Sequence, residues 1–380
     1  MSRFQFAGRL IGSSRGPQIA IRAALGLAAA VMLAACHPRH IPARPYLAFI
    51  ANQGSDSVAV VDLGTFSVTK VIGVTHHPNL MALRPHSHDL YVAGDTGIDI
   101  LDYPGLRITG HWNFPGGVSA LTFSPDGSRA LLIEKPDGRI AGFDCAARRK
   151  MAVIKSPSGL TGLALTSNGK ILVGEARSKD LVYFIDPDTQ QILGSVKTGR
   201  NPGSMVISPD NSKVYIADTG ENLITVADIP ARALLAHLEI SNPPTLLILK
   251  PDGGEIFALS ASGTRMTMLD VSQATVEEMK STGHGAAAGV FSQDSSRFYW
   301  ANEGDGTVSS MDVSTRQVLA STRVGVAPQG LALTPDGRFL MAIDGGSSSV
   351  EVVEAASTHL LTTIPVGAQP VSVIIPGWQP

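Results

Sequence analysis

Six short turn motifs recur along this chain at a constant spacing of 42 residues. They read PDG, SNG, PDN, PDG, QDS and PDG, and they begin at Pro125, Ser167, Pro209, Pro251, Gln293 and Pro335. Degenerate copies begin at Pro85, 40 residues before the first, and at Pro376, 41 residues after the last. A repeat of roughly 40–45 residues holds four short strands, which form one blade of a β-propeller. The spacing therefore predicts blades arranged around a central axis.

The copy around Pro335 shows the expected strands of one repeat. Residues 329–334 form an apolar run that suits the innermost strand, and residues 338–343 form the second strand. Between them, Asp336 and Gly337 supply the backbone conformation of a tight hairpin turn. Residues 349–353 and 359–366 are then the third strand and the outer strand.

The order of strands at the two chain ends predicts how the ring closes. The repeats begin at Tyr46 with a strand of the second type and end with a strand of the first type, residues 370–375. We expect the last strand to join the first three, so that no sheet edge stays exposed. All eight copies are then used, which predicts an all-β, eight-bladed propeller of four-stranded blades. A seven-bladed ring is the alternative, and it would leave one complete repeat outside.

The first 35 residues have the composition of an export signal. Four arginines precede an uncharged apolar stretch, residues 23–35, which is short for a membrane span. The sequence Leu33-Ala34-Ala35-Cys36 resembles the lipobox of bacterial lipoproteins, which implies that Cys36 receives lipid and becomes the mature N-terminus. An uncleaved anchor helix is the alternative. The same resemblance, with His37 rather than Asp after the cysteine, implies an outer-membrane lipoprotein facing the periplasm.

These features divide the chain into a signal peptide (1–35), a lipidated tether (36–45) and one propeller domain (46–380). Removal of the four arginines from the 30 basic residues leaves 26 against 32 acidic residues, a net charge near −6. That balance argues against a nucleic-acid partner. The other cysteine, Cys145, cannot form an intramolecular disulfide if Cys36 carries lipid. We expect a monomer held at the membrane by its lipid anchor.

Two recurring motifs resemble those of the YVTN family of β-propeller repeats. They are YIADTGENLITVADI at residues 215–229 and VG-x-x-P, which occurs at residues 324–328 and 366–370. The resemblance covers residues 46–378. It implies an exported propeller, similar in fold to the haem-d1 domain of nitrite reductase and to sugar-lactone lactonases. Because these motifs describe turns and packing, they imply the fold rather than an activity.

Residues that differ from blade to blade are the candidates for function. Nine positions before each turn-opening residue, the copies carry His76, Gly116, Ser158, Arg200, Asn242, His284 and Val326. We expect His76 with its neighbour His77, Arg200, Asn242 and His284 to surround the funnel at one end of the central channel. There they would bind an anionic or tetrapyrrole ligand. The alternative is that they are solvated loop residues.

A second set of polar residues stands at the ends of the second strands: Asn52, Glu134, Asp218, Ser260, Asn302 and Asp344. Resemblance to the lactonases raises the possibility of a calcium site here, but we expect these residues to cap turns. Two histidine pairs, His76-His77 and His86-His88, flank a strand of eight residues. They are therefore about 25 Å apart and cannot share an ion. No metal site is expected.

Residues 46–380 contain no HExxH, GxSxG, CxxC, CxxCH or phosphate-binding glycine motif. The leading hypothesis is therefore a non-enzymatic binding or scaffold module, without a cofactor, whose partner is a periplasmic or envelope protein or a small ligand. One alternative is binding or maturation of a haem-d1-like tetrapyrrole. The other is a lactonase-type hydrolase that needs a divalent metal such as calcium.

Overall fold

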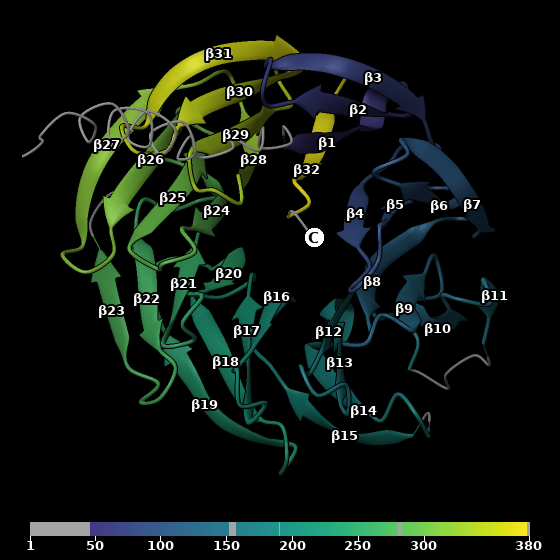
Figure 1. Ribbon diagram of the computed structural model, residues 1–380. Coiled ribbons are helices and arrows are strands. Elements are labelled where there is room, and N and C mark those ends of the chain that lie inside the picture. Colours follow the sequence, from purple (N-terminus) through teal and green to yellow (C-terminus); the bar gives the residue numbers. More distant parts are fainter. Residues whose placement is uncertain (1–45, 152–156, 190, 280–282, 378–380) are drawn as a thin grey trace, which may run out of the picture. The chain divides into compact units, whose positions relative to one another are not determined.

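In the computed structural model, residues 46–377 are described, apart from 152–156, 190 and 280–282. They form eight four-stranded antiparallel sheets arranged as the blades of a propeller (Figure 1). The eight-bladed, all-β prediction is confirmed. The expected signal peptide, Cys36 and the tether lie outside the described residues. Within the described part of the chain, no helix is long and apolar enough to cross a membrane.

The strands of each blade follow one another from the central channel outward. Blade 1 is β32 (Pro370–Ile374), β1 (Leu47–Asn52), β2 (Ser57–Asp62) and β3 (Ser67–Gly73). Blade 2 is β4 (Leu80–Leu83), β5 (Asp89–Ala93), β6 (Gly97–Asp102) and β7 (Arg107–Asn113). Blade 3 is β8 (Val118–Phe123), β9 (Arg129–Glu134), β10 (Arg139–Asp144) and β11 (Arg149–Lys150). Blade 4 is β12 (Gly162–Leu165), β13 (Leu172–Ala176), β14 (Leu181–Ile185) and β15 (Ile192–Lys197).

The second half of the ring has the same order. Blade 5 is β16 (Pro202–Ile207), β17 (Lys213–Asp218), β18 (Leu223–Asp228) and β19 (Ala233–Glu239). Blade 6 is β20 (Leu246–Leu249), β21 (Glu255–Leu259), β22 (Met266–Asp270) and β23 (Val276–Met279). Blade 7 is β24 (Ala286–Phe291), β25 (Arg297–Asn302), β26 (Thr307–Asp312) and β27 (Gln317–Arg323). Blade 8 is β28 (Pro328–Leu333), β29 (Phe339–Asp344), β30 (Ser349–Glu354) and β31 (His359–Pro365). Two short 3-10 turns, η1 (Gln53–Ser55) and η2 (Arg177–Lys179), follow β1 and β13.

The ring closes between the two ends of the repeat region. Strand β32 pairs antiparallel with β1, and Ile50 lies opposite Val373. In Figure 1 the yellow β32 lies beside the purple β1 at the inner end of blade 1. The closure predicted from the strand order is therefore confirmed, and blade 1 is built from both ends of the repeat region.

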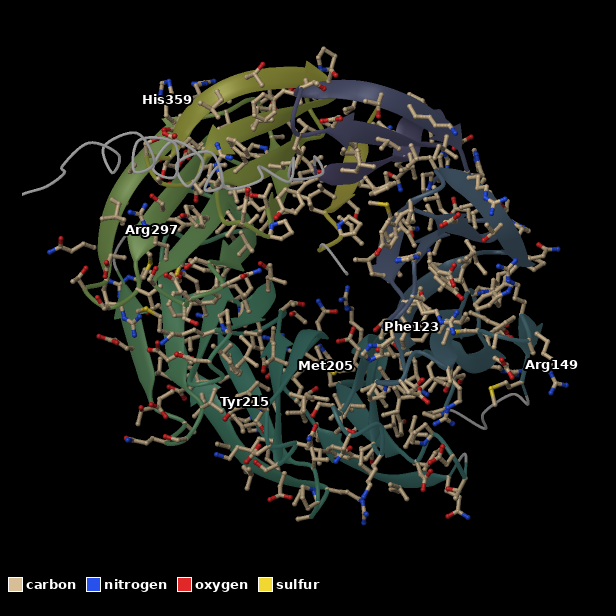
Figure 2. All side chains as sticks on the ribbon, viewed as in Figure 1. Phe123, Arg149, Met205, Tyr215, Arg297 and His359 are labelled. Atoms are coloured by element: carbon tan, nitrogen blue, oxygen red, sulfur yellow. The ribbon has the colours of Figure 1, made fainter. Side chains whose placement is uncertain are left out.

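The core lies between neighbouring blades. One apolar cluster joins Phe49 and Val60 of blade 1 to Leu90 and Val92 of blade 2, and similar clusters follow around the ring. The second and third strands are buried on both faces, because each blade packs against two neighbours. Figure 2 shows side chains filling the spaces between the blades around the ring. Burial of this apolar surface is the main driving force for the ring.

Asp side chains hold turns between third and fourth strands. The Asp62 carboxylate accepts hydrogen bonds from the backbone amides of Gly64 and Thr65, at 2.7 and 3.2 Å. The Asp312 carboxylate accepts one from the amide of Thr315 at 2.9 Å. These bonds lie between third and fourth strands and need no contact with another blade.

Strand direction divides the loops between two faces. We call the funnel face the one that carries the loops entering each first strand and the turns between second and third strands. The opposite face carries the turns between first and second strands and between third and fourth strands. His76 and His77 lie on the funnel face, whereas His86 and His88 lie in the β4–β5 turn on the opposite face, as expected.

Candidate functional site

The residues singled out from the sequence lie on the funnel face, in loops between different blades. His76 and His77 precede blade 2, Arg200 precedes blade 5, Asn242 precedes blade 6 and His284 precedes blade 7. In the described part of the chain, no hydrogen bond, ion pair or ring contact joins residues from two of these four loops. The structure therefore places the candidates on one face, but as separate local clusters.

The cluster between blades 1 and 2 contains two imidazoles and two carboxylates. His76 Nδ1 lies 2.9 Å from Asp56 Oδ2, and His77 Nδ1 lies 3.1 Å from Asp95 Oδ2. The two rings are stacked, with their centroids 3.8 Å apart. The amide of His77 donates to Asp56 Oδ1 at 2.9 Å. That bond, together with His76, keeps the pKa of Asp56 below its usual value.

The remaining candidates have local partners of their own. Arg200 Nε donates to Glu221 Oε1 at 2.6 Å, and this bond lowers the pKa of Glu221. The side chain of His284 is exposed, and its backbone amide donates to Asp305 Oδ2 at 2.7 Å. Asn242 is half-buried in the loop before blade 6. Its side chain lies so close to Gly263 that a Cβ there would stand 2.5 Å from the Asn242 Cγ atom.

The polar residues at the ends of the second strands serve the fold. Asn52, Asp218, Asn302 and Asp344 are fully buried. The Asp344 carboxylate accepts hydrogen bonds from the amides of Val326 and Ala327. Burial raises the pKa of Asp344, but these bonds, together with those from Ser347 and the amide of Gly346, lower it by more, so that it lies below the usual value. Because these side chains are withdrawn from the funnel, they do not fit an open calcium site.

Several of these residues face a glycine of a neighbouring loop. A Cβ on Gly199 would stand 2.8 Å from the Asp218 carboxyl carbon, and one on Gly283 would stand 2.6 Å from the carboxamide carbon of Asn302. The loop must therefore have glycine at this position to approach the buried side chain. Gly325 and Gly367 of the VG-x-x-P motifs face Asp344 and Asn52 in the same way, which explains why glycine recurs there.

Sequence reasoning missed Glu175, on β13. The other seven copies have an apolar residue at this position: Ala51, Ala93, Ile133, Ala217, Leu259, Ala301 and Ile343. Glu175 is only 3% exposed, and burial raises its pKa to about 7, although Thr161 and Arg177 act against the shift. The fold does not require an acid here, since seven blades have none. The signal that could have revealed it was this single departure from the repeat.

Arg177 lies beside Glu175 and is half-exposed on the funnel face. Its terminal nitrogen is 3.7 Å from Glu175 Oε1, and its Nε donates to the carbonyl of Pro202 at 3.1 Å. Thr161 Oγ1 donates to Glu175 Oε1 at 2.8 Å, while Glu175 Oε2 has no hydrogen-bond partner among the residues that the structure describes. The group is held between blades 4 and 5. It combines an accessible cation with a buried acid that titrates near neutral pH.

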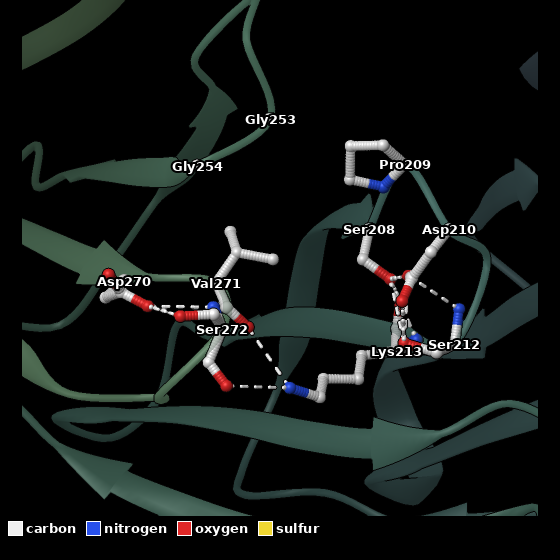
Figure 3. Close-up of a pocket in the computed structure, with 10 residues that line it drawn as sticks. All are labelled: Ser208, Pro209, Asp210, Ser212, Lys213, Gly253, Gly254, Asp270, Val271 and Ser272. Carbon is white, nitrogen blue, oxygen red and sulfur yellow. Dashed lines mark hydrogen bonds between the residues drawn. The ribbon is translucent and has the colours of Figure 1, made fainter.

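The opposite face carries a cavity of about 520 Å³ between blades 5 and 6 (Figure 3). In it, Lys213 Nζ donates to the carbonyls of Val271 and Ser272. Asp210 accepts a 2.6 Å bond from the Ser208 hydroxyl, which with other local donors lowers the pKa of Asp210 to about 2. The same serine–aspartate turn recurs in other blades. Because residues of the repeat line this cavity, it belongs to the packing of one blade against the next. The funnel face is therefore the better candidate site.

Comparison with known proteins gives structural neighbours but no family. No family model and no curated protein matches this chain. Among solved structures, dihydro-haem d1 dehydrogenase NirN in complex with DHE aligns at 14% identity and a TM-score of 0.72, over 88% of this chain and 77% of that one.

Two further structures share the fold. A functionally unknown protein from Desulfotomaculum acetoxidans aligns at 16% identity and a TM-score of 0.59, over 76% of this chain and 98% of that one. Hydrazine synthase from Kuenenia stuttgartiensis aligns at 18% identity and a TM-score of 0.54, over 67% of this chain and 88% of that one. At these identities the likeness concerns the propeller fold alone.

Proposed function

We propose that this chain is a non-enzymatic binding module of the bacterial envelope, whose funnel face binds a small anionic ligand between blades 4 and 5. The observation that carries the proposal is the pair Glu175–Arg177. A buried acid at a position that is apolar in seven other blades destabilises the fold, so we assign it to a ligand. Arg177 supplies the planar guanidinium that suits a carboxylate or phosphate.

Arg200 adds positive charge at the same seam. Lys179 belongs to η2, as Arg177 does, but its Nζ donates to the carbonyl of Ser158 at 2.9 Å, in the loop between blades 3 and 4. Because Arg200 is paired with Glu221, we expect it to attract an anion less strongly than Arg177 does. Arg177 is therefore the main anion contact in this proposal, and Arg200 is a contact at its margin.

Native mass spectrometry of the gently purified Cys36→Ser protein tests this function. We expect one bound molecule, retained by the Lys170→Ala variant and lost from the Arg177→Ala variant. Lys170 is an exposed cation in the β12–β13 turn on the opposite face, so its removal costs the same charge. Two results would overturn the small-ligand assignment in favour of a protein partner. One is a bare polypeptide mass for the Cys36→Ser protein without a further substitution, and the other is equal retention of the bound molecule by both variants.

The proposal places the protein on the membrane through lipid on Cys36, as a monomer facing the periplasm from the outer membrane. In cell fractionation, we expect the unaltered chain with the membranes and the Cys36→Ser chain in the soluble periplasm. An unaltered chain that is soluble would contradict the lipid anchor. The mass of the mature N-terminal peptide tests independently whether Cys36 carries lipid.

A tetrapyrrole ligand is the second candidate, and the similarity to NirN favours it. The exposed imidazoles of His76 and His284 are the candidate iron ligands of this chain. Haem titration followed by visible absorbance tests the candidate, with His76→Ala and His284→Ala as variants. An unchanged haem spectrum in the presence of the protein would rule it out.

A further inference from the structure

We propose that Asp56, His76 and His77 form a binding site for one divalent first-row transition metal ion, at the seam between blades 1 and 2. One ligand atom from each residue can be chosen so that all three lie within 4.8 Å of one another. Two imidazoles and one carboxylate are the donor set of open zinc and iron sites, in which further positions remain for water or substrate. This site is separate from the Glu175–Arg177 group and does not depend on the proposed function.

The distance between His76 and Asp56 fits two ligands of one ion. His76 Nδ1 and Asp56 Oδ2 are 2.9 Å apart. Two atoms that each lie about 2.1 Å from the same ion stand roughly 3.0–3.4 Å apart at ordinary coordination angles. A metal ion can therefore replace the proton between this nitrogen and oxygen with a movement of a few tenths of an ångström.

Neighbouring groups orient both side chains. The amide of His77 holds Asp56 Oδ1, which leaves Oδ2 directed at His76. Asp95 holds His77 Nδ1, so that Nε2 of this ring carries the free lone pair. A carboxylate behind a histidine is the usual second partner of a metal ligand, because it fixes the ring and makes it more basic. Two carboxylates also balance the double charge of the ion.

The repeat separates this cluster from the ordinary turn. In the corresponding turn between blades 4 and 5, the amide of Asn201 donates to Asp180 Oδ1 at 2.8 Å, which matches the bond from His77 to Asp56. That backbone bond therefore belongs to the fold. The paired imidazoles occur in one copy alone, since the corresponding pairs elsewhere are Gly116-Gly117, Ser158-Gly159, Arg200-Asn201, Asn242-Pro243, His284-Gly285, Val326-Ala327 and Ala368-Gln369.

Both rings are accessible to a metal ion. The side chains of His76 and His77 are 52% and 47% exposed, and that of Asp56 is 45% exposed. An exposed site of three ligands retains open coordination positions. At such a nitrogen and oxygen site we expect the affinity for divalent ions to follow the Irving–Williams order, with Cu²⁺ and Ni²⁺ above Co²⁺.

Titration of the full chain with Co²⁺ tests the site, because the visible absorption of Co²⁺ changes when imidazole replaces water. We expect one ion per chain at this site, with Zn²⁺ able to displace it. His76→Ala and His77→Ala should each weaken Co²⁺ binding at least ~10-fold, and Asp95→Asn should weaken it by roughly 10–100-fold.

Asp180→Asn is the matched control for Asp56→Asn, since both substitutions remove a carboxylate charge and leave an oxygen that can accept the corresponding backbone bond. Only Asp56→Asn should weaken Co²⁺ binding, and both variants should keep the circular dichroism of the native chain. The double variant His76→Ala/His77→Ala retains His37 and His40, which lie outside the described residues. Co²⁺ bound by those two histidines would therefore remain in the double variant. Equal Co²⁺ affinity and stoichiometry in the unaltered chain and the double variant would overturn the proposal.

Discussion

The hydroxyl of Tyr215 in blade 5 donates a 2.8 Å hydrogen bond to the main-chain carbonyl of Val271 in blade 6. Lys213 Nζ donates to the same carbonyl at 3.1 Å. Blades 7 and 8 repeat the arrangement, where the Tyr299 hydroxyl donates to the carbonyl of Ala355 at 2.9 Å. A strand of one blade is thus bonded to the outer turn of the next, in addition to the apolar contacts between them.

Removal of that hydroxyl should weaken the seam. The Tyr215→Phe variant leaves the aromatic ring in place but deprives the Val271 carbonyl of its buried donor. We expect the free energy of unfolding to fall by about 1 kcal/mol, as for an ordinary buried hydrogen bond. Urea unfolding measures this loss. Tyr183→Phe is the comparison, because Tyr183 is a half-buried tyrosine on β14. Equal midpoints for the two variants would contradict the role of the bond.

Glu175 should make the stability of the chain fall as pH rises from about 4.5 to 7. Its pKa is about 7 in the folded chain, against an ordinary value of 4.5, so the folded state binds the proton more tightly than the unfolded state. The contribution is therefore complete below pH 4.5 and is lost as pH rises through 7. Glu175→Gln should stabilise the chain at pH 8 by roughly 1–3 kcal/mol and change little at pH 4.5.

Thermal unfolding at pH 4.5, 6 and 8 tests this dependence. Glu239→Gln is the control, because Glu239 is exposed on β19 and its substitution removes the same charge. A stabilisation by Glu175→Gln that is the same at all three pH values would show that the effect does not come from the buried charge.

The glycines that face the buried polar ring should not tolerate a methyl group. In Gly199→Ala, the new Cβ would meet the Asp218 carboxylate, which cannot move because it is fully buried. We expect a loss of about 1–3 kcal/mol, as for other overpacked sites. Gly73→Ala is the comparison, since a Cβ there meets nothing within 4 Å. If chemical denaturation gives the same loss for both variants, the contact with Asp218 is not the cause.

Loss of the closing strand should open the ring. A chain that ends at Ala368 lacks β32, so β1 would expose an unpaired edge to solvent. We expect this truncated chain to lose cooperative unfolding and to aggregate at concentrations where the full chain stays monodisperse. Light scattering during refolding measures this. A truncated chain that unfolds like the full chain would mean that pairing of β32 with β1 contributes little.

The site was less accessible to prediction than the fold. The sequence placed His76, His77, Arg200 and His284 on one face, because their position in the repeat fixes their loop. It could not reveal that His76 pairs with Asp56 and Arg200 with Glu221, since each pair joins residues 20 or 21 positions apart. The expected absence of a metal site rested on the distance between two histidine pairs, and did not consider an acid from the preceding blade.

The repeat alone determined the eight blades, their strands and the closure of β32 onto β1, because tight turns and alternating burial are local requirements that recur with the chain. The tertiary structure decided which side chains meet across the seams between blades. Glu175 in the sequence is one acid among 32 acidic residues. Only the packing of blade 4 buries it beside Arg177 and raises its pKa to about 7, because desolvation depends on all the atoms around a group.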